Sequence, residues 1–346
     1  MSVIQYFNHQ KPFKLESGVV LPGFSLAYHT YGNMNRDASN VVWVFHALTA
    51  NSNMLDWWQS LFADDSPIHP DEYFLICVNM PGSCYGSTGP LSINPESTQP
   101  WYHSFPLITI QDMVGMYEIL RLSLGIEQIY LGVGGSMGGM QALQWAVLQP
   151  QLFQHLYLIA TNAQHSAWGI AFNAAQRMAI EADSSWKEAN ELAGYKGLRT
   201  ARAIAMISYR NYHPFKESQS DKVAKYTDFK AESYIKYQGE KLAQRFNAFS
   251  YVALSRSMDA HHVGRGYAST MEALARIRSK TMVTGIESDI LFPVEEQLQL
   301  AHGIKQATFK LIDSPFGHDG FLIETEQLKE QLKELLNTQN KFALAT

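Results

Sequence analysis

From Asn40 onward the sequence repeats one pattern, in which a short β-branched or aromatic run is followed by a turn with glycine or proline and then by a helical stretch. The expected strands are residues 41–45, 73–78, 128–133, 156–160, 281–285 and 308–312. Most of them are almost continuously hydrophobic, which is typical of strands that are covered on both faces. The pattern therefore predicts an α/β fold, with a mostly parallel central sheet and helices on both of its faces.

Two regions depart from this repeating pattern. Near the start, residues 13–15 and 24–28 alternate apolar and polar side chains and are separated by a turn, which predicts an antiparallel edge. Residues 164–278 lack the strand pattern and are rich in Ala, Gln, Lys and Glu, which indicates a helical insertion. We therefore expect a core made of residues 1–163 and 279–346, with a helical lid formed by residues 164–278.

Charge and hydropathy exclude several classes of function. The net charge is −5, with 27 basic against 32 acidic residues, so no basic field is available to attract a nucleic acid. The longest apolar runs, such as residues 41–48, are far shorter than the roughly 20 residues that cross a bilayer. The first residues also lack the basic and then apolar plan of a signal peptide. We expect a cytoplasmic protein that binds neither nucleic acid nor membrane.

The cysteine content argues against disulfides and metal. Cys77 and Cys84 are too few for a disulfide framework in a chain of 346 residues. Neither lies in a Cys-x-x-Cys or Cys/His spacing that would indicate zinc. We therefore predict two buried thiols and no metal site.

One candidate nucleophile stands between an expected strand and an expected helix. Ser136 is the central residue of Gly134-Gly135-Ser136-Met137-Gly138, which has the pattern G-x-S-x-G. In a nucleophile elbow, the flanking glycines permit a tight turn that lifts the serine hydroxyl above the sheet. The strand, turn and helix context makes Ser136 the predicted nucleophile.

An elbow serine needs a base, and the base needs an acid, in the chain order Ser, Asp or Glu, His. Asp289 and His318 follow the strands 281–285 and 308–312, so the parallel sheet would deliver both to the edge that carries the elbow. Glu287 is a rival acid, and Asp289 could instead cap a helix. We predict a Ser136–His318–Asp289 triad.

Acyl chemistry also requires two donors for an oxyanion. The backbone N–H of Met137 directly follows the nucleophile, and the N–H of Leu48 lies in the loop after the strand 41–45. We predict that these two amides form the oxyanion hole, and Thr49 can add a hydroxyl. We interpret His46 as a residue that packs or fixes this loop rather than as a catalytic group.

At this point the chain resembles the homoserine O-acetyltransferase family of the α/β-hydrolase superfamily, in a Bacteroidetes-like form. The resemblance extends over nearly the whole length and is carried by residues 46–49 (HALT), 83–90 (SCYGSTGP), 134–141 (GGSMGGMQ) and 317–322 (GHDGFL). The G-x-S-x-G pattern alone points only to the superfamily. The combination of these motifs is what points to this branch.

The resemblance implies an α/β-hydrolase fold and a definite reaction. An acetyl group would pass from acetyl-coenzyme A to Ser136 and then to the hydroxyl of L-homoserine, a step of methionine biosynthesis with ping-pong kinetics. Acetyl-coenzyme A would be a co-substrate, and no cofactor would be bound permanently. The family also implies that the insertion covers the active site and that lid helices pair two subunits.

The resemblance also suggests residues for the amino-acid substrate. Arg202 would bind the carboxylate of homoserine with the support of Tyr209, and Asp319 would bind the ammonium group. These charges suit a zwitterion. Thr49 is a further candidate at the same site.

Each of these charged residues also has an interpretation that involves no substrate. Arg202 could be one more solvated lid residue, because Arg199 and Arg210 lie nearby. Arg177 is a second candidate cation. Asp319 could merely cap a turn.

The chain also departs from the family pattern in several loops and lid segments, namely residues 79–84, 184–187, 194–196 and 247–251. They leave succinyl-coenzyme A as an alternative donor and serine as an alternative acceptor. An esterase or thioesterase with the same triad, and a binding protein without catalysis, are two further classes. The complete triad argues against the last of these.

Overall fold

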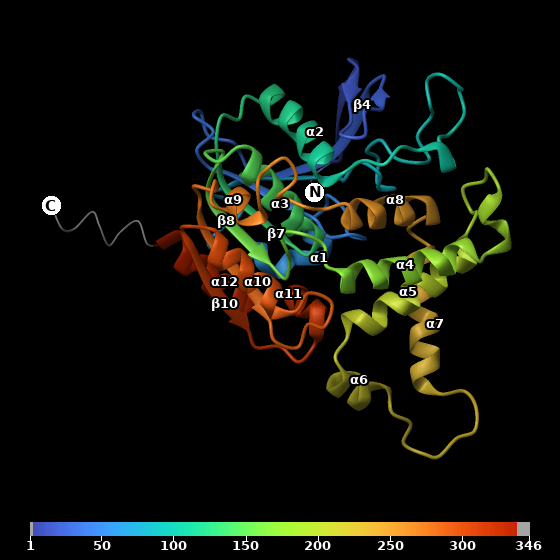
Figure 1. Cartoon of the computed structure of the whole chain (residues 1–346). Coiled ribbons are helices and arrows are strands. Elements are labelled where there is room, and N and C mark those ends of the chain that lie inside the picture. Colours follow the sequence, from blue (N-terminus) through green and yellow to red (C-terminus); the bar gives the residue numbers. More distant parts are fainter. Residues whose placement is uncertain (1–2, 338–346) are drawn as a thin grey trace.

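The computed structural model describes residues 3–337, which form an eight-stranded sheet flanked by helices (Figure 1). Across the sheet the order is β1-β4-β6-β5-β7-β8-β9-β10. The strands are β1 (Gln5–His9), β4 (Phe24–Tyr31), β5 (Val41–Phe45), β6 (Phe74–Val78), β7 (Ile129–Gly135), β8 (Phe153–Ile159), β9 (Lys280–Ile286) and β10 (Ala307–Ile312). The six strands β5 to β10 pair in parallel. At one edge, β4 pairs antiparallel with β6, and β1 pairs antiparallel with β4.

Both faces of the sheet are buried, as the apolar strand pattern predicts. Along β5 the side chains alternate: Trp43 belongs to one apolar cluster, and Val42 and Val44 belong to the other. The first face is covered by α2 (Ile110–Ser123), α3 (Met137–Leu148), α9 (Thr270–Leu274) and α10 (Val294–Gly303). The second face is covered by α1 (Leu55–Trp58), η1 (Gln59–Phe62), α11 (Gly320–Ile323) and α12 (Thr325–Asn337). The predicted α/β fold is therefore confirmed.

The N-terminal edge is antiparallel, but the expected strand pairing is wrong. The partner of β4 is β1, with Phe7 opposite Leu26, and not residues 13–15. Phe13–Lys14 (β2) instead pairs with Val20–Leu21 (β3) in a separate two-stranded sheet. An alternating pattern identifies a half-buried strand but does not say which neighbour it pairs with.

Between β8 and β9 the chain leaves the sheet and forms a group of helices that lies to one side of the core (Figure 1). We call α4 to α8 the lid helices: α4 (Ala167–Glu181), α5 (Tyr195–Tyr209), α6 (Tyr212–Gln219), α7 (Lys230–Ala243) and α8 (Ala248–Asp259). Three short 3₁₀ turns occur in the connections, at Tyr102–Ser104 (η2), Ser184–Lys187 (η3) and Gly317–Asp319 (η4).

The chain enters and leaves the lid helices through one narrow neck. His165 N–H donates to the carbonyl of His261 at 3.1 Å, and Val263 N–H donates to that of Ala163 at 2.9 Å. These antiparallel contacts hold the two connections side by side. Within residues 3–337, no helix has the length and apolar character that a membrane span requires.

Candidate active site

Ser136 lies in a strained turn between β7 and α3. Its backbone angles are φ 56° and ψ −127°, which is an unusual conformation for a residue with a side chain. Two hydrogen bonds hold it there: Ser136 N–H donates to Ile159 O at 2.9 Å, and the Thr161 hydroxyl donates to Ser136 O at 2.8 Å. The turn has the strand, serine and helix order of a nucleophile elbow.

Gly138 allows the first turn of α3 to touch the end of β5. A Cβ atom at this position would lie 2.1 Å from the carbonyl oxygen of Phe45, so no other residue fits without a backbone shift. This close approach places the start of α3 beside the loop that begins at His46. The amides of Met137 and Leu48 come from these two neighbouring segments.

The structure brings Ser136, His318 and Asp289 into one hydrogen-bonded chain. His318 Nε2 lies 2.9 Å from Ser136 Oγ, and His318 Nδ1 lies 2.6 Å from Asp289 Oδ2. The carboxylate of Asp289 can only accept a hydrogen bond, so Nδ1 of His318 carries the hydrogen. Nε2 then faces the serine hydroxyl with its lone pair. All three residues are buried. The arrangement is that of a base ready to take the serine proton.

The environment of His318 favours a protonated imidazole once the serine proton has been taken. Its ring stacks on Phe292, with centroids 5.0 Å apart, and packs edge-on against Phe321. Burial by itself disfavours the imidazolium, but the charge and hydrogen bond of Asp289 outweigh it, so the pKa of His318 is raised above its usual 6.5.

Asp289 both caps the next segment and faces the histidine. Its Oδ1 accepts from the N–H groups of Leu291 and Phe292, at 2.8 and 3.0 Å, while Oδ2 faces His318. The two alternatives for this residue are therefore compatible, because each uses a different oxygen. Glu287 is exposed, and among the described residues it is Asp289 that provides the carboxylate bonded to the imidazole.

The two amides expected at the oxyanion hole are both available. Among the described residues, neither Leu48 N–H nor Met137 N–H has a hydrogen-bond acceptor, and both residues are buried. A buried N–H without an acceptor is uncommon and needs an explanation. A ligand oxygen that carries negative charge would satisfy both.

His46 fixes the loop that carries Leu48. Its Nε2 accepts from Met80 N–H at 3.0 Å, so Nδ1 carries the hydrogen and donates to Ala47 O at 2.9 Å. Burial lowers the pKa of His46 to about 4, which keeps the ring neutral at ordinary pH. This geometry matches the interpretation of His46 as a loop-fixing residue.

A cavity of about 400 Å³ joins the histidine to the residues expected to bind substrate. Its lining includes Leu48, Thr49, Arg202, Tyr209, His318 and Asp319. Arg202 and Tyr209 come from lid helix α5, whereas His318 and Asp319 come from η4 of the core. The cavity therefore lies between the lid helices and the core.

Charged groups in and beside this cavity are only partly paired. Arg202 stacks over the ring of Tyr209, 5.2 Å from its centroid, and its buried Nη1 has no hydrogen-bond partner among the described residues. Asp319 pairs with Arg210 at 3.3 Å, and the buried Nε of Arg210 also lacks a partner there. Asp319 makes no side-chain capping bond to α11. Such unsatisfied groups are costly unless a ligand completes them.

Two other arginines proved different from what sequence indicated. Arg177 forms an ion pair with Asp259 at 2.6 Å and does not line the cavity. Arg245 does line the cavity, and its Nη1 donates to Thr49 O at 2.6 Å. No sequence motif marks Arg245, so the sequence alone does not identify it.

No metal centre is visible in the part of the chain that the structure describes. Within residues 3–337 there is no group of three or more His, Cys, Asp or Glu side chains that could hold an ion. Cys77 is a buried free thiol, and Cys84 is a half-buried one.

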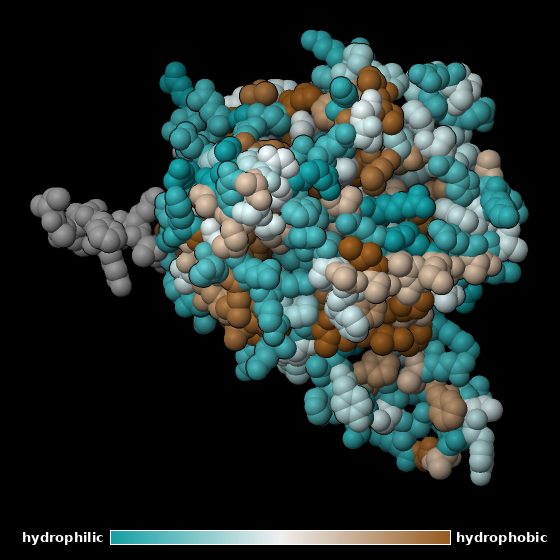
Figure 2. Space-filling model, in the orientation of Figure 1, coloured by the Kyte–Doolittle hydropathy of each residue, from teal (hydrophilic) through white to brown (hydrophobic). Residues whose placement is uncertain are grey.

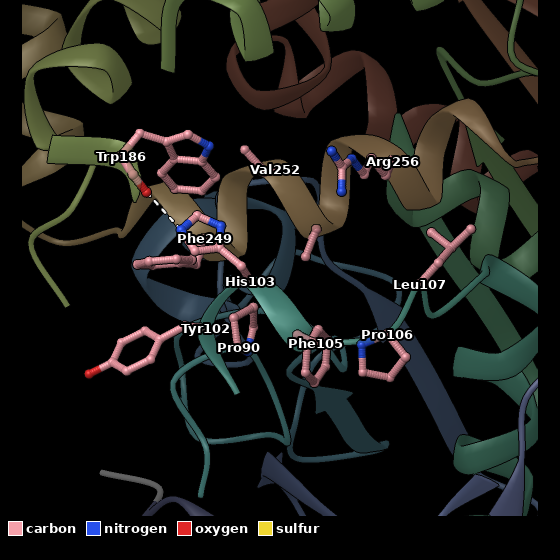
Figure 3. A pocket seen from close by; sticks show the side chains of 11 residues that line it. Pro90, Tyr102, His103, Phe105, Pro106, Leu107, Trp186, Phe249, Val252 and Arg256 are labelled. Carbon is pink, nitrogen blue, oxygen red and sulfur yellow. Dashed lines mark hydrogen bonds between the residues drawn. The ribbon is translucent and has the colours of Figure 1, made fainter. Parts of the chain in front are cut away.

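A second, smaller hollow of about 110 Å³ lies between residues 102–107 and α8 (Figure 3). Phe249, Val252 and Arg256 of α8 line it, and His103 contacts the carbonyl of Trp186 at 2.7 Å. None of the triad residues lines it. It is therefore separate from the cavity at His318.

The comparisons with known proteins agree with this fold. The family model described as the alpha/beta hydrolase fold matches residues 40–325. The solved structure of a homoserine O-acetyltransferase from Bacillus anthracis superposes with a TM-score of 0.91 at 24% identity, over 97% of this chain and 98% of that one. An acetylester hydrolase from Corynebacterium glutamicum superposes with a TM-score of 0.86 at 24% identity, over 96% and 95%. The chain is an α/β-hydrolase-fold protein.

The sequence relatives define the branch. A homoserine O-acetyltransferase of Cyclobacterium marinum is 45% identical over 336 residues, which cover 97% of this chain and 96% of that protein. This chain belongs to the homoserine O-acetyltransferase family. The resemblance found in the sequence motifs is thereby confirmed.

Proposed function

We propose that this protein transfers the acetyl group of acetyl-coenzyme A to the hydroxyl of L-homoserine through an acetyl-Ser136 intermediate. The observation that carries the proposal is that His318, which is hydrogen-bonded to Ser136 and Asp289, lines one cavity with Arg202 and Asp319. A triad alone supports acyl transfer in general. The cation and anion beside it suit an amino-acid acceptor.

In the first half-reaction, His318 Nε2 takes the proton of Ser136 as Oγ attacks the thioester carbonyl. The negative oxygen that develops would be received by the free N–H groups of Leu48 and Met137. When the tetrahedral intermediate collapses, the carbon–sulfur bond breaks, and the coenzyme A thiolate takes the proton from His318. An acetyl ester of Ser136 remains.

In the second half-reaction, His318 takes the proton of the homoserine hydroxyl, and the hydroxyl oxygen attacks the acetyl carbonyl. Ser136 leaves and regains a proton from His318. Arg202, with Tyr209 beneath it, would hold the substrate carboxylate, and Asp319 would hold the ammonium. The Thr49 hydroxyl is at the wall of the same cavity. The product, O-acetyl-L-homoserine, enters methionine biosynthesis.

The choice of acetyl over succinyl rests on the charges in the cavity. A donor with a free carboxylate would require a cation that is buried and unengaged in the acyl pocket. Arg245 is exposed, and its Nη1 already bonds Thr49 O and the Tyr85 hydroxyl. Arg202 has a buried nitrogen without a partner among the described residues, but in this proposal it binds the carboxylate of homoserine. It would therefore not be available to a succinyl carboxylate.

A thiol-release assay tests this function. Acetyl- or succinyl-coenzyme A is mixed with the enzyme, with and without L-homoserine or L-serine, and free thiol is followed with time. We expect steady release only with acetyl-coenzyme A and homoserine together. Release at the same rate without any alcohol would identify a hydrolase, and release with succinyl-coenzyme A or serine would change the substrates.

We also propose that residues 164–278 act as the lid and that lid helices pair two subunits. Apolar side chains are exposed on three of these helices, at Met178 of α4, Ile207 of α5 and Tyr237 of α7, with 60–67% of each exposed. Figure 2 shows apolar surface over the α4 and α5 part of the molecule. An exposed apolar patch of this kind is typical of an interaction surface.

Light scattering at working concentration tests the pairing. We expect the mass of a homodimer for the native chain and a shift toward monomer for Ile207→Asp. A monomer in the native protein would contradict the proposal. Because the proposed reaction consumes acetyl-coenzyme A in amino-acid biosynthesis, we place it in the cytoplasm.

A further inference from the structure

Arg245 connects the lid helices to the loop that carries the oxyanion amide. It lies just after α7, and its guanidinium Nη1 donates to the carbonyl of Thr49 at 2.6 Å and to the hydroxyl of Tyr85. Thr49 is 196 residues away in the sequence and directly follows Leu48. The contact therefore joins the lid to the residue beside the predicted oxyanion donor.

The orientation of the Leu48 N–H depends on the peptides around it. In a trans peptide the N–H and the C=O point in opposite directions, so fixing Ala47 O also fixes the direction of Leu48 N–H. Ala47 O accepts from Ala50 N–H at 3.0 Å and from His46 Nδ1 at 2.9 Å. These two donors therefore fix the direction of the Leu48 N–H.

Arg245 holds the peptide whose N–H supports Ala47 O. Thr49 O has no other donor than Arg245 among the described residues, and Thr49 N–H has no acceptor there. The same Thr49–Ala50 peptide carries the Ala50 N–H that donates to Ala47 O, so the guanidinium steadies the donor that fixes the Ala47–Leu48 peptide. The loop of residues 46–50 is thus held between a core histidine and a lid arginine.

The lid end of this contact is itself fixed. Glu240 of α7 pairs with Arg199 of α5 at 2.9 Å and accepts from the Tyr195 hydroxyl at 2.5 Å. The backbone of Arg245 is bonded as well, because its N–H donates to Leu242 O at 2.9 Å. A displacement of α5 and α7 would therefore displace the guanidinium from Thr49.

The electrostatic surroundings of Arg245 favour a structural role for its hydrogen bonds. Both acceptors of Nη1 are uncharged, and no carboxylate within the described residues forms an ion pair with this side chain. A charged donor bonds a carbonyl more strongly than a neutral one. Such a bond suits the positioning of a backbone carbonyl.

We propose that Arg245 is a positioning residue that orients the oxyanion loop, so that Ser136 becomes fully reactive only when the lid helices are seated on the core. This inference rests on the proposed function, since it assumes acyl chemistry at Ser136. It assigns no contact between Arg245 and substrate. The guanidinium acts through Thr49 O on the neighbouring Leu48 amide.

The test compares Arg245→Met and Arg245→Lys with the native protein and with Arg256→Met. Arg256 is an exposed lid arginine whose nearest carboxylate, on Glu181, is 4.0 Å away, so it is a matched control. Two probes report on the oxyanion hole without an anionic substrate. One is the burst of p-nitrophenol when Ser136 is acetylated by p-nitrophenyl acetate, and the other is the affinity for an alkyl boronic acid, which forms a tetrahedral adduct with the serine.

Loss of a whole oxyanion donor costs ~10²–10³ in rate, and a misoriented donor costs less. We expect Arg245→Met to lower both the acetylation rate and the boronic-acid affinity by about 10-fold, while the KM of homoserine stays within about 2-fold. The lysine variant should recover part of the loss, because an ammonium can still donate to Thr49 O. Arg256→Met should match the native protein.

Two results would overturn the inference. One is unchanged acetylation and boronic-acid affinity in Arg245→Met. The other is a raised KM for acetyl-coenzyme A or homoserine at constant kcat, which would make Arg245 a substrate-binding residue. If Arg245→Met does not fold, the lysine variant, checked by its melting temperature, decides by the same measurements. Failure of the native protein to give a burst would instead defeat the proposed function.

Discussion

The catalytic side and the lid side of the cavity differ in how completely their polar groups are paired. On the catalytic side, Ser136, His318 and Asp289 are joined by hydrogen bonds of 2.9 and 2.6 Å before any substrate is present. On the lid side, the buried Arg202 Nη1 has no partner in the described part of the chain, and neither has the Nε of Arg210 beside the cavity. The triad side chains are paired with one another, whereas two guanidinium nitrogens near the lid have no partner.

The difference indicates which step each side serves. Chemistry that begins with a proton transfer gains from groups that are already aligned, because no reorganisation is needed during the reaction. Recognition of a zwitterion gains from groups that are satisfied only by the right ligand, because an analogue without the charge leaves them unpaired. In the proposed function, the triad would therefore serve the acyl chemistry, and Arg202 on the lid would help to select the acceptor.

The largest expected effect comes from breaking the catalytic side. Ser136→Ala removes the nucleophile, so acetyl-enzyme should not form, and turnover should fall by about 10⁴-fold or more. Mass spectrometry after mixing with acetyl-coenzyme A measures the acetyl adduct directly. The melting temperature of the variant is the control for folding. Full turnover in a folded Ser136→Ala protein would refute Ser136 as the nucleophile.

The next effect comes from breaking the lid side. Arg202→Met should raise the KM of homoserine by about 10- to 100-fold, since a lost charged hydrogen bond costs ~1.5–3 kcal/mol. Acetyl-enzyme formation should stay within about 3-fold of native. Steady-state kinetics with both substrates varied separates the two effects.

Arg199→Met provides the matched control for that variant, because Arg199 lies on the same helix and pairs with Glu240 instead. Its homoserine KM should be unchanged. If Arg202→Met raised the KM of both substrates equally, Arg202 would have no special role at the amino-acid site.

The pH dependence of acylation tests the role of His318 on the catalytic side. His318 must be neutral to accept the serine proton, and its pKa is raised above 6.5 by Asp289. As pH falls through this raised pKa, the imidazole becomes charged, and kcat/KM for the acetyl donor should fall about 10-fold per pH unit. His46, with a pKa of about 4, does not titrate in this range. An acid limb centred below 6.5 would contradict this assignment.

The smallest expected effect is on stability. A buried guanidinium nitrogen without a partner costs ~1–3 kcal/mol, and its contact with the Tyr209 ring recovers part of this. Arg202→Met should therefore stabilise the free protein by about 1 kcal/mol. Added homoserine should raise the melting temperature of the native protein but not of the variant. A variant clearly less stable than native would show that the lid side is not under strain.

Much of the fold was open to prediction because strand hydrophobicity depends on local burial alone. The apolar runs at residues 41–45 and 281–285 became β5 and β9 almost without shift. The convergence of Ser136, Asp289 and His318 followed from one rule, that parallel strands end at the same edge of a sheet. The positions of these three residues after successive strands were sufficient to predict their convergence.

Other features were beyond the reach of any pattern. The pairing of β1 with β4 was missed because Gln5–His9 is a largely exposed edge strand with only a weak apolar signal. Arg245 and Thr49 are 196 residues apart in the chain, and no local sequence pattern indicates that they are in contact. The ion pair of Arg210 with Asp319 likewise depends on where the end of α5 meets η4.

The sequence by itself determined the parallel α/β architecture, the helical insertion and the order of the three triad residues, because these depend on hydrophobic periodicity and on turns encoded by neighbouring residues. Only the tertiary structure decided which charges remain unpaired in the cavity and which lid arginine reaches the oxyanion loop. Those outcomes depend on distances of a few ångströms between helices and loops, set by packing over the whole molecule and not by any local segment.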